Sequence, residues 1–204
     1  DFVLYRSGGF LFQKEMGTYK KDDPDAKKTD FVIDYPCSFF TENIVSQLKT
    51  IADSFDGEDK LNFILSFVNS IPYQKEAIEN DYWMTPYEIL RVWYGDCEDH
   101  SFLLSSFFRL LDYDSLLVLF NGKQGYSGHI AVCVNPQTSQ NKIILPKTGF
   151  ESYDSTDPKY SQFYWCESTP NTNDSGCWKV GEKPKFYEHL VLEKTFLIHG
   201  RQLQ

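Results

Sequence analysis

The strongest candidate for chemistry in this sequence is Cys97, which follows Gly95 and Asp96 at the predicted start of a helix. The amino end of a helix carries partial positive charge, which lowers the pKa of a thiol and favours the thiolate nucleophile. A lone cysteine is more often a small, buried core residue. A core cysteine needs no glycine turn, acidic cap and helix start, however, so this setting favours a nucleophile.

A nucleophilic cysteine needs a general base, and the chain has four histidines, His100, His129, His189 and His199. His129 follows Gly128 and opens the apolar segment 130–134, so a strand end would hold its imidazole rigid and accessible; a surface histidine at a strand edge is the alternative. His100 lies one helical turn after Cys97, which would leave the far wall of the pocket without a base. We therefore predict that His129 is the base and that the two later histidines are structural.

The third group should be a carboxylate that orients the imidazole. Glu167 directly follows the strand-prone segment 163–166, whereas Asp154 lies in a polar, turn-rich run. An orienting residue works best on a rigid strand that pairs with the strand of the histidine, which favours Glu167 and leaves Asp154 as its rival.

Four segments in the first half of the chain have helical character. Apolar residues recur at three- and four-residue spacing over 61–71, and a further helix is expected over 42–54. The Thr-Pro-Tyr-Glu sequence at 85–88 is a capping box with proline in first position, and Gly95 is placed to end that helix. The dense apolar set over 97–111 predicts a helix that is buried on most sides.

Strand-like segments dominate the second half, at 116–120, 129–134, 142–145, 162–166, 178–180 and 186–192. Weaker strand character occurs at 2–19 and 31–40. Helices followed by an antiparallel sheet predict an α+β fold, with the N-terminal helices packed on the sheet. Because there is no internal repeat and the mixed-charge run 20–30 is typical of a surface loop, we predict one domain over 1–204.

Several motifs together resemble the transglutaminase-like superfamily, most closely its bacterial and archaeal cysteine-peptidase-like branch. They are Asp-Tyr-Trp-Met-Thr-Pro-Tyr-Glu at 81–88, Tyr-Gly-Asp-Cys-Glu-Asp-His-Ser at 94–101 and Gly-His at 128–129. The acidic strand end at 164–169 and the Gly-Trp turn within 176–184 are also similar to that branch. The resemblance covers roughly residues 61–184, the expected core of the domain.

The resemblance implies a papain-like fold and a Cys-His-Asp/Glu triad, carried here onto Cys97, His129 and Glu167. Many relatives have aspartate as the third residue of the triad, so glutamate is a departure, and Asp154 remains the alternative orienting acid. The superfamily includes acyl-transferring transglutaminases, peptidases, amidases and members that have lost activity. The fold alone does not choose among these activities.

Acidic residues Asp96, Glu98 and Asp99 flank the candidate nucleophile. Some periplasmic proteases of the superfamily bind calcium beside the catalytic cysteine through acidic residues of this signature. Consecutive helical residues point about 100° apart, so all three side chains should not converge on one ion. An N-cap and first-turn carboxylates that complement the helix dipole are the favoured interpretation, and we assign neither a metal nor a cofactor.

Composition narrows the partners and the setting. The hydrophobic content of 41% is ordinary for a globular protein. The net charge of −9 would repel a phosphate backbone, so nucleic acid is not an expected partner. No apolar run approaches the roughly 18 residues of a membrane span. The chain starts at Asp1 rather than Met, so a leader or anchor removed in processing is compatible with it, and an extracytoplasmic location is favoured.

The five cysteines leave at least one unpaired within the chain. A disulfide between Cys166 and Cys177 would staple the intervening loop in an oxidising compartment, and this pairing stays open. Taken together, the sequence predicts a cysteine-thiolate hydrolase that acts on peptide or amide carbonyls, with a protein or peptide as substrate. Acyl transfer to amines and a non-catalytic binding module that keeps the fold are the alternatives.

Overall fold

The computed structural model falls into two units, residues 1–44 and 45–204, which are described here one at a time. The organisation as a single domain therefore stays a prediction. The residues that the structure describes are 2–7, 10–15, 33–34, 46–47, 49–75, 83–123, 127–138, 142–145, 150–153, 158–170 and 177–198.

The first unit contains a three-stranded antiparallel sheet of β1 (Phe2–Ser7), β2 (Phe10–Glu15) and β3 (Ile33–Asp34) in the order β1-β2-β3. β1 and β2 pair along their whole length, from Phe2 opposite Glu15 to Ser7 opposite Phe10. The strand character predicted for 2–19 and 31–40 is confirmed where these residues are described.

Three helices of the second unit follow their sequence signals. α2 (Glu58–Asn69) buries the apolar face whose spacing predicted it, and residues 46–47 and 49–52 are helical within the predicted segment 42–54. α4 (Cys97–Leu110) has every residue from 98 to 108 buried, as its dense apolar sequence predicted. None of the helices among the described residues combines the length and the apolar character that a bilayer crossing requires.

α3 (Pro86–Val92) begins where its capping box predicted. The Thr85 hydroxyl accepts the Glu88 N–H at 3.3 Å, and the Glu88 carboxylate accepts the Thr85 N–H at 2.8 Å. The predicted end is wrong: the helix stops at Val92, and Trp93 adopts a left-handed conformation with φ 60°. Gly95 is thereby free for another role, at the start of α4.

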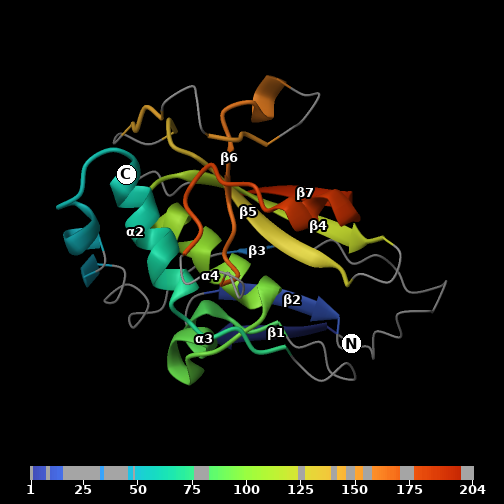
Figure 1. The fold of residues 1–204 in the computed structure, drawn as a ribbon. Helices are drawn as coiled ribbons and strands as arrows, with labels where there is room; N and C mark the ends of the chain where they lie inside the picture. Colours follow the sequence, from blue (N-terminus) through green and yellow to red (C-terminus); the bar gives the residue numbers. More distant parts are fainter. Residues whose placement is uncertain are drawn as a thin grey trace. The chain divides into compact units, whose positions relative to one another are not determined.

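The sheet of the second unit is antiparallel in the order β6-β5-β4-β7. Its strands are β4 (Asp114–Gly122), β5 (His129–Asn135), β6 (Tyr164–Cys166) and β7 (Leu190–Ile198). α4 packs on β5 and β4, while α2 and α3 pack on α4 (Figure 1). The predicted α+β arrangement, with helices laid on an antiparallel sheet, is confirmed.

Three predicted strands need correction. Residues 142–145 and 178–180 belong to no strand. The segment 186–192 divides into a 3₁₀ turn, η2 (Lys185–His189), and the first residues of β7. Pro184 precedes η2 and cannot donate to a ladder, so the chain turns once before it pairs with β4. A second 3₁₀ turn, η1 (Pro158–Tyr160), precedes β6.

Candidate active site

The start of α4 is built around Asp99 rather than around the cysteine. The Asp99 carboxylate accepts the backbone N–H of Asp96 at 3.2 Å and that of Met84 at 2.7 Å. A Cβ on Gly95 would lie 2.8 Å from the Asp99 Cβ, so only glycine leaves room for this contact. Much of the Gly-Asp-Cys-Glu-Asp motif therefore serves to fix where the helix begins, as the N-cap and first-turn interpretation predicted; the bond from Met84 to Asp99 was not predicted.

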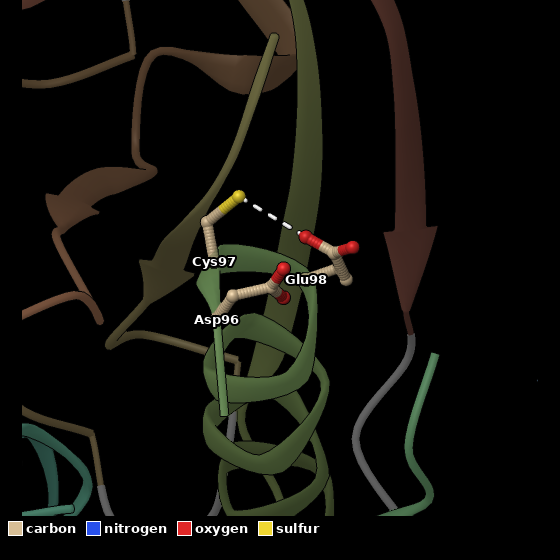
Figure 2. A group of neighbouring side chains, drawn as sticks. All are labelled: Asp96, Cys97 and Glu98. Carbon is tan, nitrogen blue, oxygen red and sulfur yellow. Dashed lines mark hydrogen bonds between the residues drawn. The ribbon is translucent and has the colours of Figure 1, made fainter. Parts of the chain in front are cut away.

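Cys97 occupies the first turn of α4 and is half-buried. Its thiol donates a hydrogen bond to the Glu98 carboxylate, with 3.1 Å between Sγ and Oε2 (Figure 2). The Ile130 backbone lies close enough to the thiol to lower its pKa in part, and the hydroxyl of Ser101, one turn further along α4, donates to the Ile130 carbonyl at 2.9 Å. Two successive turns of α4 thus lie beside the residue that follows His129.

The expected lowering of the pKa of the Cys97 thiol is wrong. Burial raises this pKa well above its ordinary value, and the adjacent Glu98 carboxylate raises it further, while the Ile130 backbone lowers it only in part. The helix dipole contributes about 0.3–1 kcal/mol at an exposed site, which is small beside burial and a neighbouring anion. The resting group is therefore a protonated thiol, and a nucleophilic role requires a base.

His129 stands at the first position of β5, opposite Phe120 of β4. A Cβ on Gly128 would lie 3.0 Å from the Phe120 carbonyl oxygen, so the glycine before the histidine allows close pairing at the strand end. The imidazole Nε2 lies 2.9 Å from Oε2 of Glu167. Because an ionised carboxylate only accepts, Nε2 carries the hydrogen, and in the neutral ring Nδ1 is left as the basic nitrogen.

The pairing of β5 with β6 explains this contact. Val132 lies opposite Cys166 and Cys133 opposite Trp165, so one further step would set Ala131 opposite Glu167. His129 lies two residues from Ala131 and therefore points to the same face, within diagonal reach of Glu167. The contact predicted between Glu167 and His129 is thus present, whereas its rival Asp154 lies outside the described residues.

Glu167 is fully buried and accepts four hydrogen bonds. His129 and the Tyr187 hydroxyl donate to Oε2, and the Thr169 hydroxyl and N–H (2.8 Å) donate to Oε1. Burial by itself would raise the pKa of this carboxyl, but the imidazole and the hydroxyl donors reverse the effect and lower it. Nothing in the sequence indicated Tyr187; Thr169, two residues after the acid, could have been suspected from its position.

The other histidines do not join this pair. His100 is fully buried on α4, and its ring packs edge-on against Tyr73, with 6.3 Å between ring centroids. Neither ring nitrogen has a hydrogen bond of normal geometry, although the Ser168 backbone lies close enough to favour protonation slightly. Burial lowers the pKa of His100 to about 4. His189 is exposed at the end of η2, and His199 lies outside the described residues.

His100 should make the protein sensitive to mild acid. Its pKa falls from 6.5 to about 4 on folding, so between these pH values the unfolded chain binds a proton that the folded chain does not. This difference lowers the stability of the folded state as the pH falls. Stability is then complete above about pH 6.5, and roughly 3 kcal/mol of it is lost as the pH falls to about 4. Glu167, whose pKa is lowered, contributes a separate loss that begins as the pH falls through the ordinary range of a glutamate and continues below it.

Urea unfolding between pH 4 and 7 measures this loss. His100→Phe should flatten the slope in that window, because the group that takes up the proton on unfolding is gone. His189→Gln, a change at an exposed histidine, should leave the slope as in the parent protein. An unchanged slope in His100→Phe would show that other groups govern the acid sensitivity.

The acidic residues beside Cys97 do not form a convincing cation site. Asp96, Cys97 and Glu98 each bring one potential ligand atom within 4.8 Å of the others (Figure 2). The three carboxylates do not all converge, as expected, because the Asp99 carboxylate instead accepts two backbone N–H groups. Calcium takes six to eight oxygen ligands, which can include backbone carbonyls and waters. Among the described residues, two carboxylates and a thiol supply only part of that set, so we assign no metal here.

The possible disulfide between Cys166 and Cys177 is absent. Cys166 is buried and Cys177 is exposed, and both are free thiols, as are Cys97 and Cys133. Cys133 is buried in the core, on β5 between two buried valines.

Comparison with known proteins gives weak similarities. No family model matches the chain. The human protein CC2D2B is 29% identical over 105 residues, which are 52% of this chain but 7% of the human protein, so the chain spans a small part of that relative. Solved structures of Legionella pneumophila LapG cover 74% of this chain: the calcium-bound form at 15% identity and TM-score 0.39, over 83% of its length, and the EGTA-treated form at 17% and 0.38, over 81%.

Proposed function

We propose that this protein is a cysteine hydrolase of papain-like fold that acts on peptide or amide carbonyls, with Cys97 as nucleophile, His129 as base and Glu167 as orienting acid. The hydrogen bond between the His129 imidazole and the buried Glu167 carboxylate is the observation that carries the proposal. A buried carboxylate that holds one imidazole nitrogen leaves the other available as a base.

The position of the thiol supports the same assignment. Ser101, one turn after Cys97, donates to the carbonyl of Ile130, the residue directly after His129, and the Ile130 backbone also lies near the Cys97 thiol, so nucleophile and base belong to neighbouring parts of α4 and β5. In the resting state the thiol donates to Glu98. The first step of the proposed reaction is a rotation of the Cys97 side chain, which exchanges Glu98 for Nδ1 of His129 as the acceptor of the thiol proton.

The chemistry then follows from these groups. The thiolate attacks the carbonyl carbon while His129 holds the proton, and Glu167 stabilises the imidazolium. The Cys97 N–H, in the first turn of α4, is available to the oxyanion of the tetrahedral intermediate. Collapse of the intermediate expels the amine, which takes the proton from His129, and water then releases the acid from the thioester under the same base.

Two alternatives are weighed against hydrolysis. Acyl transfer uses the same thioester and differs only in that an amine, not water, resolves it. A binding module that keeps the fold would not require the donors that hold Glu167 ionised. A protein or peptide substrate is the partner class that fits the proposed chemistry, and a location outside the cytoplasm stays a prediction.

A competing amine separates hydrolysis from acyl transfer. With a peptide amide as substrate, millimolar primary amine should divert little of the product, because water is far more concentrated and an amine competes only if the protein binds it. Mass spectrometry of the products measures the ratio of the acid, formed with water, to the new amide, formed with the added amine. A tertiary amine at equal concentration, which cannot form an amide, is the control. Amide as the main product would establish acyl transfer instead.

A further inference from the structure

We propose that Tyr187 is a positioning residue, which fixes the carboxylate of Glu167 through its hydroxyl and thereby orients the imidazole of His129. Its catalytic consequence rests on the proposed function. The physical claim, that Tyr187 sets the state of Glu167, stands apart from any activity.

Tyr187 and His129 share one carboxylate oxygen. The Tyr187 hydroxyl donates to Oε2 of Glu167, the same atom that lies 2.9 Å from Nε2 of His129. The two donor rings also contact each other, with 5.6 Å between their centroids. Since a carboxylate that rotated away from His129 would also break the bond to Tyr187, the hydroxyl resists that rotation.

The ring of Tyr187 is held rigidly in the core. It is 5% exposed and packs against Trp165 and Phe120, with centroid distances of 5.2 and 5.3 Å. Its neighbour Phe186 meets the His129 ring edge to face at 5.2 Å. Consecutive residues of η2 thus contact the acid and the base, a placement that an extended strand, with its alternating side chains, would not produce.

The backbone of η2 is closed by its own turn and tied at its far end to β4. The Tyr187 N–H donates to the Pro184 carbonyl at 3.1 Å. The Lys123 N–H, just beyond β4, donates to the His189 carbonyl at 2.9 Å, and Gly122 pairs with Leu190. A hydroxyl carried by this segment is therefore pre-positioned, as an orienting group requires.

The hydrogen bond between Tyr187 and Glu167 has one possible direction, with the hydroxyl as donor and the carboxylate as acceptor. Burial, together with the Glu167 charge, raises the pKa of Tyr187 well above its ordinary value, so the hydroxyl stays protonated and donates. The four donors to Glu167 match the capacity of a carboxylate. Among the described residues, the titratable groups that interact with this carboxylate include His129 and Cys133 from β5, Cys166 from β6, Tyr187 from η2, His100 from α4 and Tyr73.

Tyr187→Phe tests the proposal, because it removes the hydroxyl and keeps the ring. We expect the pKa of Glu167, followed by carboxyl ¹³C NMR, to rise by about one pH unit when one donor to the anion is lost. Acylation of Cys97 by p-nitrophenyl acetate, the probe in the absence of a known substrate, should slow about tenfold with its acid limb moved to higher pH. The concentration of p-nitrophenyl acetate that gives half of the maximal acylation rate should not change.

Tyr153→Phe is the matched control. Tyr153 is equally buried in the same aromatic cluster, its ring lies 5.6 Å from Trp165, and its hydroxyl shares a 2.8 Å hydrogen bond with Thr195 instead of Glu167. This variant should lose similar thermal stability while the acylation rate and the titration of Glu167 stay as in the parent protein.

The outcomes separate the two proposals. If Glu167 titrates unchanged in Tyr187→Phe, Tyr187 is a packing residue and the inference is overturned. If Glu167 shifts as expected but no variant alters acylation, the inference stands and the proposed function fails. Should Tyr187→Phe not fold, 3-fluorotyrosine at this one position keeps the shape with a more acidic hydroxyl. The pKa of Glu167 should then fall, and an unchanged value would overturn the inference.

Discussion

Replacement of Cys97 with alanine should abolish formation of the acyl-enzyme and lower turnover by roughly 10⁴- to 10⁶-fold, as expected when a covalent nucleophile is removed. Without the thiol, His129 and Glu167 have no group to activate. Stopped-flow release of p-nitrophenolate from p-nitrophenyl acetate, with intact-mass detection of the acetylated protein, measures both the burst and the adduct.

The fold should survive this change, because alanine is smaller than cysteine and the side chain lies at the half-buried start of α4. Cys177→Ser is the control, since Cys177 is an exposed free thiol that the proposal gives no role. Acetylation that persists in Cys97→Ala and disappears in Cys177→Ser would contradict the assignment of the nucleophile.

Glu167→Gln should slow the same acylation by roughly 10²- to 10⁴-fold. The amide has the shape of the carboxylate but carries no charge to stabilise the imidazolium, and its NH₂ group is a donor among groups that donate. His129, Tyr187 and Thr169 all direct hydrogens at this side chain, so at least one donor is left unsatisfied. Stability should fall by about 1–3 kcal/mol in a urea titration.

Two control variants accompany the change. Glu151→Gln alters an exposed carboxylate and should leave acylation as in the parent protein. Asp154→Ala, at the rival position outside the described residues, should be nearly silent. Loss of acylation in Asp154→Ala together with retention in Glu167→Gln would reverse the choice of orienting acid.

The sequence was informative wherever the signal lies within a few residues. The capping box at Thr85 and Glu88 predicted the start of α3, because both partners are local to one turn. The glycine before His129 and the apolar run after it predicted the start of β5, and the dense apolar pattern predicted the buried α4. The α+β arrangement followed from the order of these elements along the chain.

Only the tertiary structure decided the electrostatics of the candidate site. The local rule at a helix start predicts a lowered thiol pKa, but burial and the orientation of Glu98 raise it, and neither can be inferred from the neighbouring sequence. Likewise the end of α3 was misjudged, because Gly95 is required for the approach of Asp99 and not for the helix end.

The hydrogen-bond partners of Glu167 show which contacts a local sequence pattern can predict and which it cannot. Strand pairing could be inferred from the positions of His129 and Glu167, since both adjoin runs with clear strand character. Tyr187 lies in a segment that was predicted as a strand, and it reaches Glu167 because Pro184 and the core around Trp165 impose a turn there. Propensity acts over a few residues, whereas a buried carboxylate takes its donors from wherever packing brings the chain, and that packing is settled by the whole fold.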